Sequence, residues 1–192
     1  EDGDAALVDA LLRHVEAEVV SDPRGASISD WDRVFSTLSP TLAGERVQAL
    51  RASGADVPVV GGIDLASPTF RLIGEAATVG SWFVTPYPFP QDVPDLDDWI
   101  ATYEAVGPHV PYPGPYALPT YDAVYLVADV MARVLAGGQD PTRDVMREAL
   151  AGAHHSGILG EVSFDGDGHW PGSALYTYRW DVDGPELLAV SP

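Results

Sequence analysis

A five-residue apolar run, Val57 to Gly61, lies in the first half of the chain. A short apolar run bounded by turn residues is typical of a strand that is buried on both faces. Gly61 and Gly62 open a turn after it, and Asp64 follows at the strand's carboxyl end. Ser67-Pro68 then supply an N-cap and a first helical residue. The pattern therefore predicts a strand, a turn that carries an acidic residue, and a helix over 68–74.

The same order occurs immediately upstream. Arg33 to Thr37 predicts a strand, and Ser39-Pro40 begin a helix with one apolar face. That helix ends at Gly54, a residue suited to the left-handed position after a helix. Strand, helix, strand and helix in succession predict an α/β fold, with a parallel sheet and right-handed crossovers. Ligands of such sheets bind beyond the carboxyl ends of the strands, which is where Asp64 is expected.

The remaining periodicity predicts further helices and strands. In chain order, the elements expected are a helix around Val8–Val15, strands at 18–21 and 78–85, helices at 94–106, 118–136 and 141–151, and strands at 161–164, 174–180 and 186–190. Asp140-Pro141 is expected to cap the helix at 141–151. A proline- and tyrosine-rich stretch, 86–121, is expected either to face a ligand or to connect two lobes.

Helix 118–136 is the most apolar predicted element. One apolar stripe runs from Tyr121 to Leu135 and a second from Leu126 to Val134. Its polar line consists of Asp122, Asp129 and Arg133. A helix this apolar is expected to be covered on most sides.

Composition excludes several classes of function. The chain has 192 residues, and its 29 acidic residues against 10 basic ones give a formal charge of −19. Nucleic acids and anionic membranes require clustered positive charge, so neither is an expected partner. All ten basic residues are arginines, which excludes a Walker A lysine and a Schiff-base lysine. Cysteine is absent, which excludes disulfides and thiolate sites, and no cofactor is expected.

Other candidate motifs have simpler explanations. Asp165-Gly166-Asp167-Gly168 resembles part of a calcium loop but lacks an acidic residue at position twelve, so a β-turn is expected. His154-His155 lack the spacing of a metal site and are expected at the surface or in a hinge. Asp97-Asp98 point about 100° apart on a helix, which favours a solvated helix start over a glycosidase pair. We expect no metal ligands, and a small α/β hydrolase remains the enzymatic alternative.

Long segments of the chain resemble one known family. These are VFSTLSPTLAGERVQALRASGADVPVVGGIDLASPTFRLIGEAATVGSWFVTPY, ALPTYDAVYLVADVMARVL, DVMREALAGAHHSGILGEVSFDGDGHW and LYTYRWDVDG. Together they resemble the branched-chain amino-acid-binding type of ABC-transporter substrate-binding protein, which has the type I periplasmic-binding fold. The resemblance spans most of residues 5–190 and covers the C-terminal half of that family.

The resemblance implies a division of the chain into two lobes. Residues 1–86 and 173–192 would form the second, C-terminal lobe, a parallel-sheet βαβ lobe. Residues 87–172 would return to a first lobe whose N-terminal strands are absent. Helices 94–106, 118–136 and 141–151 would then lack their usual cover, so we expect the missing N-terminal lobe, a homodimer partner or a rearranged lobe to cover them.

The resemblance also implies ligand-binding residues. The acidic residue after the GG turn binds a ligand's amino group in amino-acid-binding relatives, and Asp64 occupies that place, one residue later than in the family pattern. Gly62 and the turn at Leu38 and Ser39 match ligand-facing loops. Tyr116 and Tyr121 are the aromatic candidates from a cleft-facing segment.

The implied function is that of a non-enzymatic solute-binding domain for an amine-bearing ligand such as an amino acid, which it delivers to the permease of an ABC transporter. Such a protein would be extracytoplasmic. The alternative is the ligand-sensing domain of a cytoplasmic regulator with the same fold. The chain opens with Glu1-Asp2-Gly3-Asp4, so we expect that a signal peptide was removed or that the chain is a piece of something longer.

Overall fold

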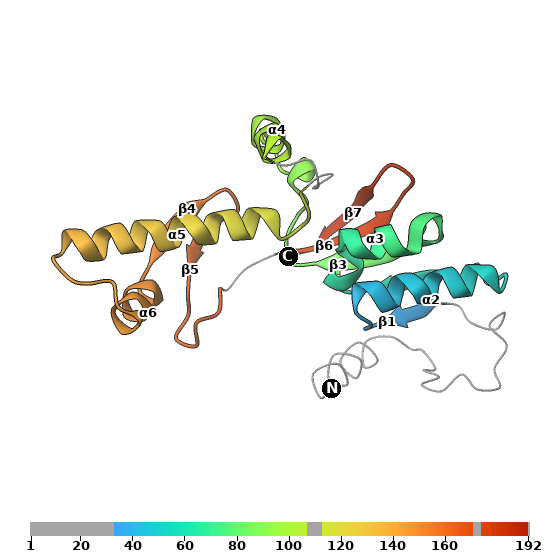
Figure 1. Ribbon diagram of the computed structural model, residues 1–192, viewed down its shortest axis with the longest axis horizontal. Helices are drawn as coiled ribbons and strands as arrows, with labels where there is room; N and C mark the ends of the chain where they lie inside the picture. The colour runs from blue at the N-terminus through green and yellow to red at the C-terminus, as the bar shows by residue number, and fades with distance from the viewer. Residues whose placement is uncertain (1–32, 107–112, 171–173, 192) are drawn as a thin grey trace. The chain divides into compact units, whose positions relative to one another are not determined.

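The structure is a computed structural model that describes residues 33–106, 113–170 and 174–191 (Figure 1). The chain divides into two compact units. Unit 1 contains described residues 33–83 and 179–184, and unit 2 contains the other described residues from 84 onward. The helix expected around Val8–Val15 and the strand expected at 18–21 lie outside the described residues.

Unit 1 is built on the predicted strand–helix–strand–helix order. Its elements are β1 (Val34–Ser36), α2 (Pro40–Ala52), β2 (Val59–Gly61), the 3-10 helix η2 (Ile63–Ala66), α3 (Pro68–Gly74) and the 3-10 helix η3 (Glu75–Thr78). β1 and β2 pair in parallel with Ser36 opposite Gly61. β3 (Trp82–Thr85) pairs in parallel with β2, with Phe83 opposite Gly61. The predicted α/β fold with a parallel βαβ unit is therefore confirmed.

The described strands form two sheets. The first has the order β1-β2-β3-β6-β7, and the second is the hairpin of β4 and β5. The bounds of these later strands are β4 His154–Gly157, β5 Gly160–Ser163, β6 Leu175–Trp180 and β7 Pro185–Ser191. In unit 1, the end of β6 is held by two backbone bonds: Trp180 N donates to the Ser81 oxygen at 2.9 Å, and Gly80 N donates to the Trp180 oxygen at 2.8 Å.

The core of unit 1 lies between its strands and the adjacent helices α2 and α3 (Figure 1). Its largest buried side chains are Val47, Leu65, Phe70, Phe83 and Trp180. The Trp180 indole lies 5.5 Å from the Phe83 ring, and its Nε1 donates to the Leu65 carbonyl at 2.7 Å. Burying a tryptophan requires such a partner for its N–H, and the bond ties β6 to η2.

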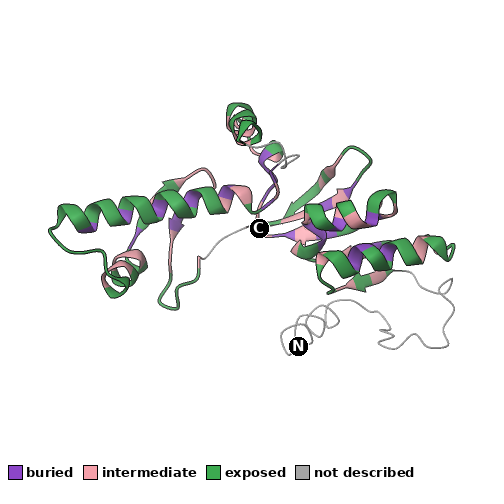
Figure 2. Ribbon diagram, viewed as in Figure 1, coloured by how far each residue is buried: buried purple, intermediate pink, exposed green. Residues whose placement is uncertain are grey.

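Unit 2 contains three helices and the hairpin: α4 (Asp97–Ala105), α5 (Ala117–Ala136) and α6 (Arg143–Ala151). A hydrophobic cluster joins α5 to α6 and to the β4–β5 hairpin. Its members are Leu126, Val130, Val134, Ala153 and Val162, with Val145, Met146, Ala149, Leu150, Phe164 and Trp170 packed around them. Figure 2 shows that the buried positions of α5 form a narrow series along one side of the helix.

The structure corrects the strand predicted over 78–85. Only Trp82–Thr85 forms a strand, because the preceding residues form η3. The Thr78 hydroxyl donates to the Glu75 carbonyl at 2.8 Å and accepts from Arg71 Nη1 at 2.7 Å. These side-chain bonds hold the segment in a helical turn and remove it from the sheet.

Two helices begin later than predicted, and one strand, β4, was not predicted. The helix predicted at 94–106 begins at Asp97, because Asp95 adopts a left-handed φ of 62° that a helix cannot include. The helix predicted at 141–151 begins at Arg143, and Thr142 caps it in place of Asp140-Pro141: the Thr142 hydroxyl accepts from Val145 N at 3.5 Å. His154 and His155 lie in β4, where His154 is exposed, as the surface alternative predicts, and His155 is half-buried.

Candidate functional site

The candidate residues of unit 1 lie at one edge of its sheet. Because β1 and β2 are parallel with Ser36 opposite Gly61, the loops that follow them leave the sheet from the same edge. Leu38 and Ser39 belong to the first loop, and Gly62 opens the second. All three residues are exposed, so both loops present backbone groups to solvent.

Gly61 allows this edge to pack tightly. A Cβ placed on Gly61 would lie 2.7 Å from the Leu65 Cδ1 atom and 2.8 Å from the Ser36 carbonyl oxygen. The neighbouring Gly62 has open space around its Cα. The first glycine is therefore required by packing against β1 and η2, whereas the second leaves room beside the loop.

Asp64 is exposed and lies in η2. Its backbone oxygen accepts from Ser67 N at 3.3 Å, but its carboxylate has no hydrogen bond or ion pair within the described part of the chain. Gly62 is the N-cap of η2, and Ser67 caps α3 by accepting from Thr69 N at 3.2 Å. The Asp64 carboxylate thus does not cap either helix, and it is available to a cationic group.

Leu38 and Ser39 end the other loop. Leu38 donates its backbone N–H to the Ser36 hydroxyl at 3.4 Å, and its side chain is 37% exposed. Ser39 is the N-cap of α2, yet its hydroxyl makes no capping bond, while its carbonyl accepts from Ala43 N at 2.9 Å. The Ser39 hydroxyl therefore remains exposed at the same sheet edge as Gly62 and Asp64.

Unit 2 carries an open groove with a volume of about 500 Å³. It is lined by Tyr87, Tyr116, Pro119, Thr120, Ala123, Val124 and Val127. Tyr116 stands at the N-cap of α5 and is 55% exposed, and its ring lies 6.4 Å from that of Tyr87. The structure therefore brings the predicted Tyr116 together with Tyr87 in an aromatic, uncharged groove.

Two contacts hold Tyr87 in place. Its backbone N donates to the buried Thr85 hydroxyl at 2.9 Å, and that hydroxyl donates back to the Tyr87 carbonyl at 2.5 Å. Its ring stacks on Trp170, with a centroid separation of 6.1 Å and an interplanar angle of 18°. The Trp170 indole in turn donates to the Glu161 carbonyl at 3.2 Å. The Thr85 hydroxyl thus holds the backbone of Tyr87, and the loop after β5 holds its ring.

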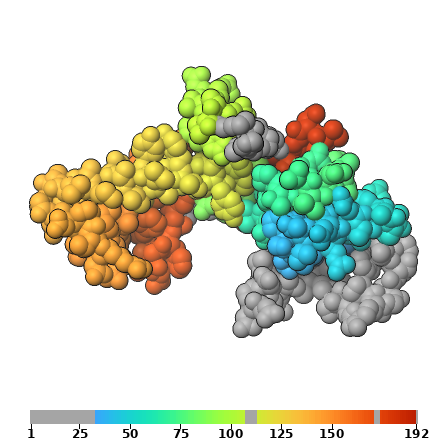
Figure 3. Space-filling view, viewed as in Figure 1, coloured from blue at the N-terminus to red at the C-terminus, as the bar shows by residue number. Residues whose placement is uncertain are grey.

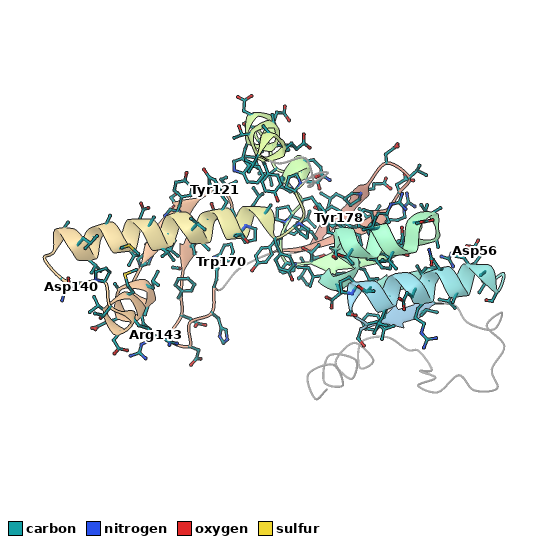
Figure 4. All side chains as sticks on the ribbon, in the orientation of Figure 1. Asp56, Tyr121, Asp140, Arg143, Trp170 and Tyr178 are labelled. Atoms are coloured by element: carbon teal, nitrogen blue, oxygen red, sulfur yellow. The ribbon has the colours of Figure 1, made fainter. Side chains whose placement is uncertain are left out.

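Tyr121 does not line this groove. Its ring lies 5.7 Å from Trp99 of α4 and 4.6 Å from Tyr125 of α5, and Figure 4 shows it on the α4 side of α5. The hydrogen bond with Tyr125 raises the pKa of Tyr121. The structure therefore separates the two predicted tyrosines: Tyr116 lies in the groove, and Tyr121 belongs to an aromatic contact between helices.

A hydrogen-bonded pair in unit 2, the buried Tyr178 and the half-buried Asp92, was not predicted from the sequence. The Tyr178 hydroxyl donates to the Asp92 carboxylate at 2.8 Å and accepts from Phe89 N at 3.0 Å (Figure 4). Burial raises the pKa of Asp92, and the bond from Tyr178 opposes that rise. Burial also raises the pKa of Tyr178. Together these bonds attach β6 to the proline-rich segment around η4 (Pro90–Asp92).

The other motifs have structural roles. Asp165 forms the predicted turn, because its carboxylate accepts from Asp167 N at 3.0 Å and from His169 N at 2.8 Å. His155 Nδ1 lies 3.2 Å from the Asp129 carboxylate. Within residues 33–106, 113–170 and 174–191, no three histidine, aspartate or glutamate side chains are grouped as metal ligands. Among those same residues, no helix has the length and apolar character that crossing a bilayer requires.

Sequence reasoning missed Tyr87 and Thr120 as groove residues. Both lie in the proline- and tyrosine-rich stretch 86–121, so that stretch was the available signal. It did not single out these two residues, because their proximity depends on how segment 86–92 approaches the start of α5.

A family model described as "Periplasmic binding protein" matches residues 25–185. Solved structures with a similar fold include the leucine-binding protein LivK of Thermotoga maritima, with a TM-score of 0.68 and 19% identity over 90% of this chain and 49% of that one. LivJ of Streptococcus pneumoniae, in complex with isoleucine, has a TM-score of 0.66 and 21% identity over 91% of this chain and 51% of its own.

A solute-binding protein of an R. palustris ABC transporter, in complex with benzoate, has a TM-score of 0.68 and 19% identity over 91% of this chain and 49% of that one. No curated protein sequence matches the chain. At these identities the solved structures establish the fold alone. The chain spans about half the length of the structures it matches.

Proposed function

Because its residues 25–185 match the family model, the chain belongs to the periplasmic binding protein family, and we propose that it binds a small amine-bearing ligand such as an amino acid. The observation that supports this ligand class is Asp64. An exposed carboxylate at the carboxyl edge of two parallel strands, with no bond to the described residues, is suited to a ligand's ammonium group.

The other proposed contacts supplement this charge. In unit 1, the backbone of Gly62 and the Leu38–Ser39 turn offer hydrogen bonds from the same sheet edge as Asp64. In unit 2, Tyr116 offers an exposed ring at the groove, with Tyr87 beside it, and Tyr121 is the second aromatic candidate. Aromatic faces suit the apolar part of an amino acid, so Tyr116 and Tyr121 are the proposed aromatic contacts within unit 2.

The proposed role in the cell is delivery of the ligand to the permease of an ABC transporter, in an extracytoplasmic location. Family membership supports this role, as does the likeness to a solute-binding protein of an ABC transporter. The chain has 29 acidic residues and only 10 basic ones, a balance that disfavours nucleic acid or an anionic membrane surface as a partner.

Calorimetry on the protein expressed from its complete reading frame tests the ligand proposal. The panel contains the twenty amino acids and benzoate, which has no amine. Asp64→Asn keeps the size of the side chain and removes its charge, so we expect the affinity for the bound amino acid to fall by roughly 10- to 100-fold, the equivalent of a charge-assisted bond.

Asp56→Asn is the matched control, because Asp56 is a fully exposed carboxylate of unit 1 that lies 4.0 Å from Arg51. It should bind as tightly as the wild type. Unchanged affinity in Asp64→Asn, or tight binding of benzoate with no amino acid bound, would exclude Asp64 as the amine contact.

A further inference from the structure

Two residues of the polar line predicted on α5 contact the β4–β5 hairpin. Asp122 and Asp129 are nearly two turns of helix apart, so their side chains leave α5 on the same side. Asp122 binds the tip of the hairpin, where it accepts from Ile158 N at 2.9 Å. Asp129 lies 3.2 Å from Nδ1 of His155 in β4. In the space-filling view, the orange segment that follows α5 lies directly against the yellow helix (Figure 3).

These two contacts differ in chemistry. The Asp122 carboxylate is buried and binds backbone N–H groups, which keep their protons throughout the neutral and mildly acidic range. Asp129 faces an imidazole, a group that gains or loses its charge between about pH 5 and pH 8. The contact between His155 and Asp129 becomes an ion pair only when the imidazole is protonated. One attachment of the hairpin is therefore insensitive to the charge on His155, and the other depends on it.

Within the hairpin, the side of β4 that carries His155 is apolar. Val162 lies opposite His155 in β5 and is buried. Glu161 lies opposite Ser156, and because side chains alternate along a strand it faces the other side of the hairpin. His169, in the loop after β5, lies 3.7 Å from the Asp165 carboxylate and is largely exposed. The hairpin itself thus offers His155 no carboxylate.

The helices that pack on the hairpin supply one. In α5, Arg133 donates from Nε to the Asp129 backbone oxygen at 3.4 Å. The inward residues of α6 are apolar, and its charged residues are exposed: Arg143, Asp144, Arg147 and Glu148. Across residues 33–106, 113–170 and 174–191, no carboxylate other than that of Asp129 pairs with His155.

Two opposing effects act on a protonated His155. Its side chain is only 13% exposed, and burial disfavours a charge. The carboxylate of Asp129 and the formal charge of −19 on the chain both favour a positive imidazole. The Asp129 side chain is 60% exposed, so this carboxylate stays hydrated while it pairs. Only the docked hairpin holds the imidazole beside Asp129, so protonation favours the docked form over an opened one.

The hairpin also supports a wall of the groove. The Trp170 indole, in the loop after β5, donates to the Glu161 carbonyl at 3.2 Å, and its ring stacks on Tyr87. The attachment of the hairpin to α5 therefore bears on how firmly the Tyr87 ring is held.

We propose that His155 and Asp129 make the attachment of the β4–β5 hairpin to α5 sensitive to pH: protonation of His155 adds an ion pair that holds the hairpin more firmly. The ion pair is fully present at a pH where the imidazole is protonated whether the hairpin is docked or open. It is lost as the pH rises and the imidazole becomes neutral. This proposal is independent of the ligand assigned to Asp64.

Hydrogen exchange tests the proposal, because the N–H groups of Ile158 and Leu159 exchange when the hairpin tip leaves Asp122. Exchange is followed by NMR at pH 5.5 and pH 7.5, and each rate is compared with the intrinsic rate at the same pH. We expect the protection of these two groups to be roughly two- to five-fold greater at pH 5.5, the effect of a partly exposed ion pair.

Variants assign the effect to the pair. Asp129→Asn keeps the size of the side chain and removes its charge, and His155→Gln removes the imidazole. Each should abolish the pH dependence of protection, and the double variant should behave like either one. His154→Gln and His169→Gln are the controls, because both histidines are exposed, and each control should keep the full dependence. Equal protection of the wild type at the two pH values would overturn the proposal, as would a dependence that survives in Asp129→Asn or disappears in a control.

Discussion

At the scale of single residues, partial burial of the Asp92 carboxylate lowers the stability of the folded protein when that carboxylate is charged. Burial raises its pKa above the value that it has in an unfolded chain, so the charged form is less favourable in the folded state than in the unfolded state. The cost is absent at a pH where Asp92 is protonated in both states. It develops as the pH rises through the unfolded value of 3.8 and then through the raised folded value.

Asp92→Asn should therefore stabilise the protein at pH 7 and have little effect at pH 3. The amide oxygen can still accept from the Tyr178 hydroxyl, while the charge is removed. Asp92 is only partly buried, so solvent screening limits the gain to about 0.5 kcal/mol. Urea unfolding at both pH values measures this, with Asp56→Asn as the control. A variant less stable than wild type at pH 7 would contradict the sign.

Adjacent glycines at the candidate site provide a second residue-scale prediction. Gly61→Ala should destabilise the protein by about 1–3 kcal/mol, because its Cβ would lie 2.8 Å from the Ser36 carbonyl oxygen and strand β1 would have to shift. Gly62→Ala should change the stability by less than about 0.5 kcal/mol, since no atom lies within 4 Å of its Cβ and its φ is −87°. Thermal unfolding of the pair tests this, and equal losses would refute the packing explanation.

At the scale of elements, local chemistry predicted the helix starts that depend on one residue. Ser67-Pro68 begin α3 as expected, and Gly54 follows α2 with a left-handed φ of 83°. The predicted extent of β3 was wrong because the Arg71 side chain donates to the Thr78 hydroxyl, seven residues later, a bond that apolar periodicity does not reveal. The strand β4 was missed because its stability comes from pairing with β5, with His155 opposite Val162.

In the candidate site, too, some features follow from local sequence and others depend on tertiary contacts. The sequence placed Asp64, Gly62 and Ser39 after adjacent strands, because turn residues and apolar runs are local signals. It did not predict that Tyr87 meets Tyr116, or that Tyr178 bonds to Asp92, 86 residues earlier. Those contacts depend on tertiary packing of the proline-rich segment, which periodicity alone does not determine.

The β4–β5 hairpin is held to α5 by Asp122. The Asp122 carboxylate is buried and accepts from Ile158 N at 2.9 Å and from Leu159 N at 3.0 Å. Gly157 makes the approach possible, since a Cβ there would lie 2.5 Å from the carboxylate. A helix residue therefore satisfies the two N–H groups at the tip of a hairpin.

Asp122→Asn should destabilise the protein by about 1–3 kcal/mol, because the amide can accept one of these bonds and directs its NH₂ group at the other donor. Asp144→Asn is the control: its carboxylate is exposed and lies 3.6 Å from Arg147, so its loss should cost at most about 0.5 kcal/mol. Urea unfolding monitored by circular dichroism compares the two. A loss for Asp122→Asn no larger than that of the control would show that the hairpin does not depend on this bond.

At the scale of the whole molecule, two neighbouring residues of α5 should differ in how much their replacement destabilises the protein. Val130 is 1% exposed and Met131 is 40% exposed. In the 192-residue chain, Val130→Ala should cost about 1–3 kcal/mol, because it opens a cavity in the cluster with α6 and the hairpin. Met131→Gln should cost less than about 0.5 kcal/mol there, because the side chain already contacts solvent.

Denaturant unfolding of both variants measures the two costs. Equal losses would contradict the explanation that Val130 packs in the cluster whereas Met131 contacts solvent.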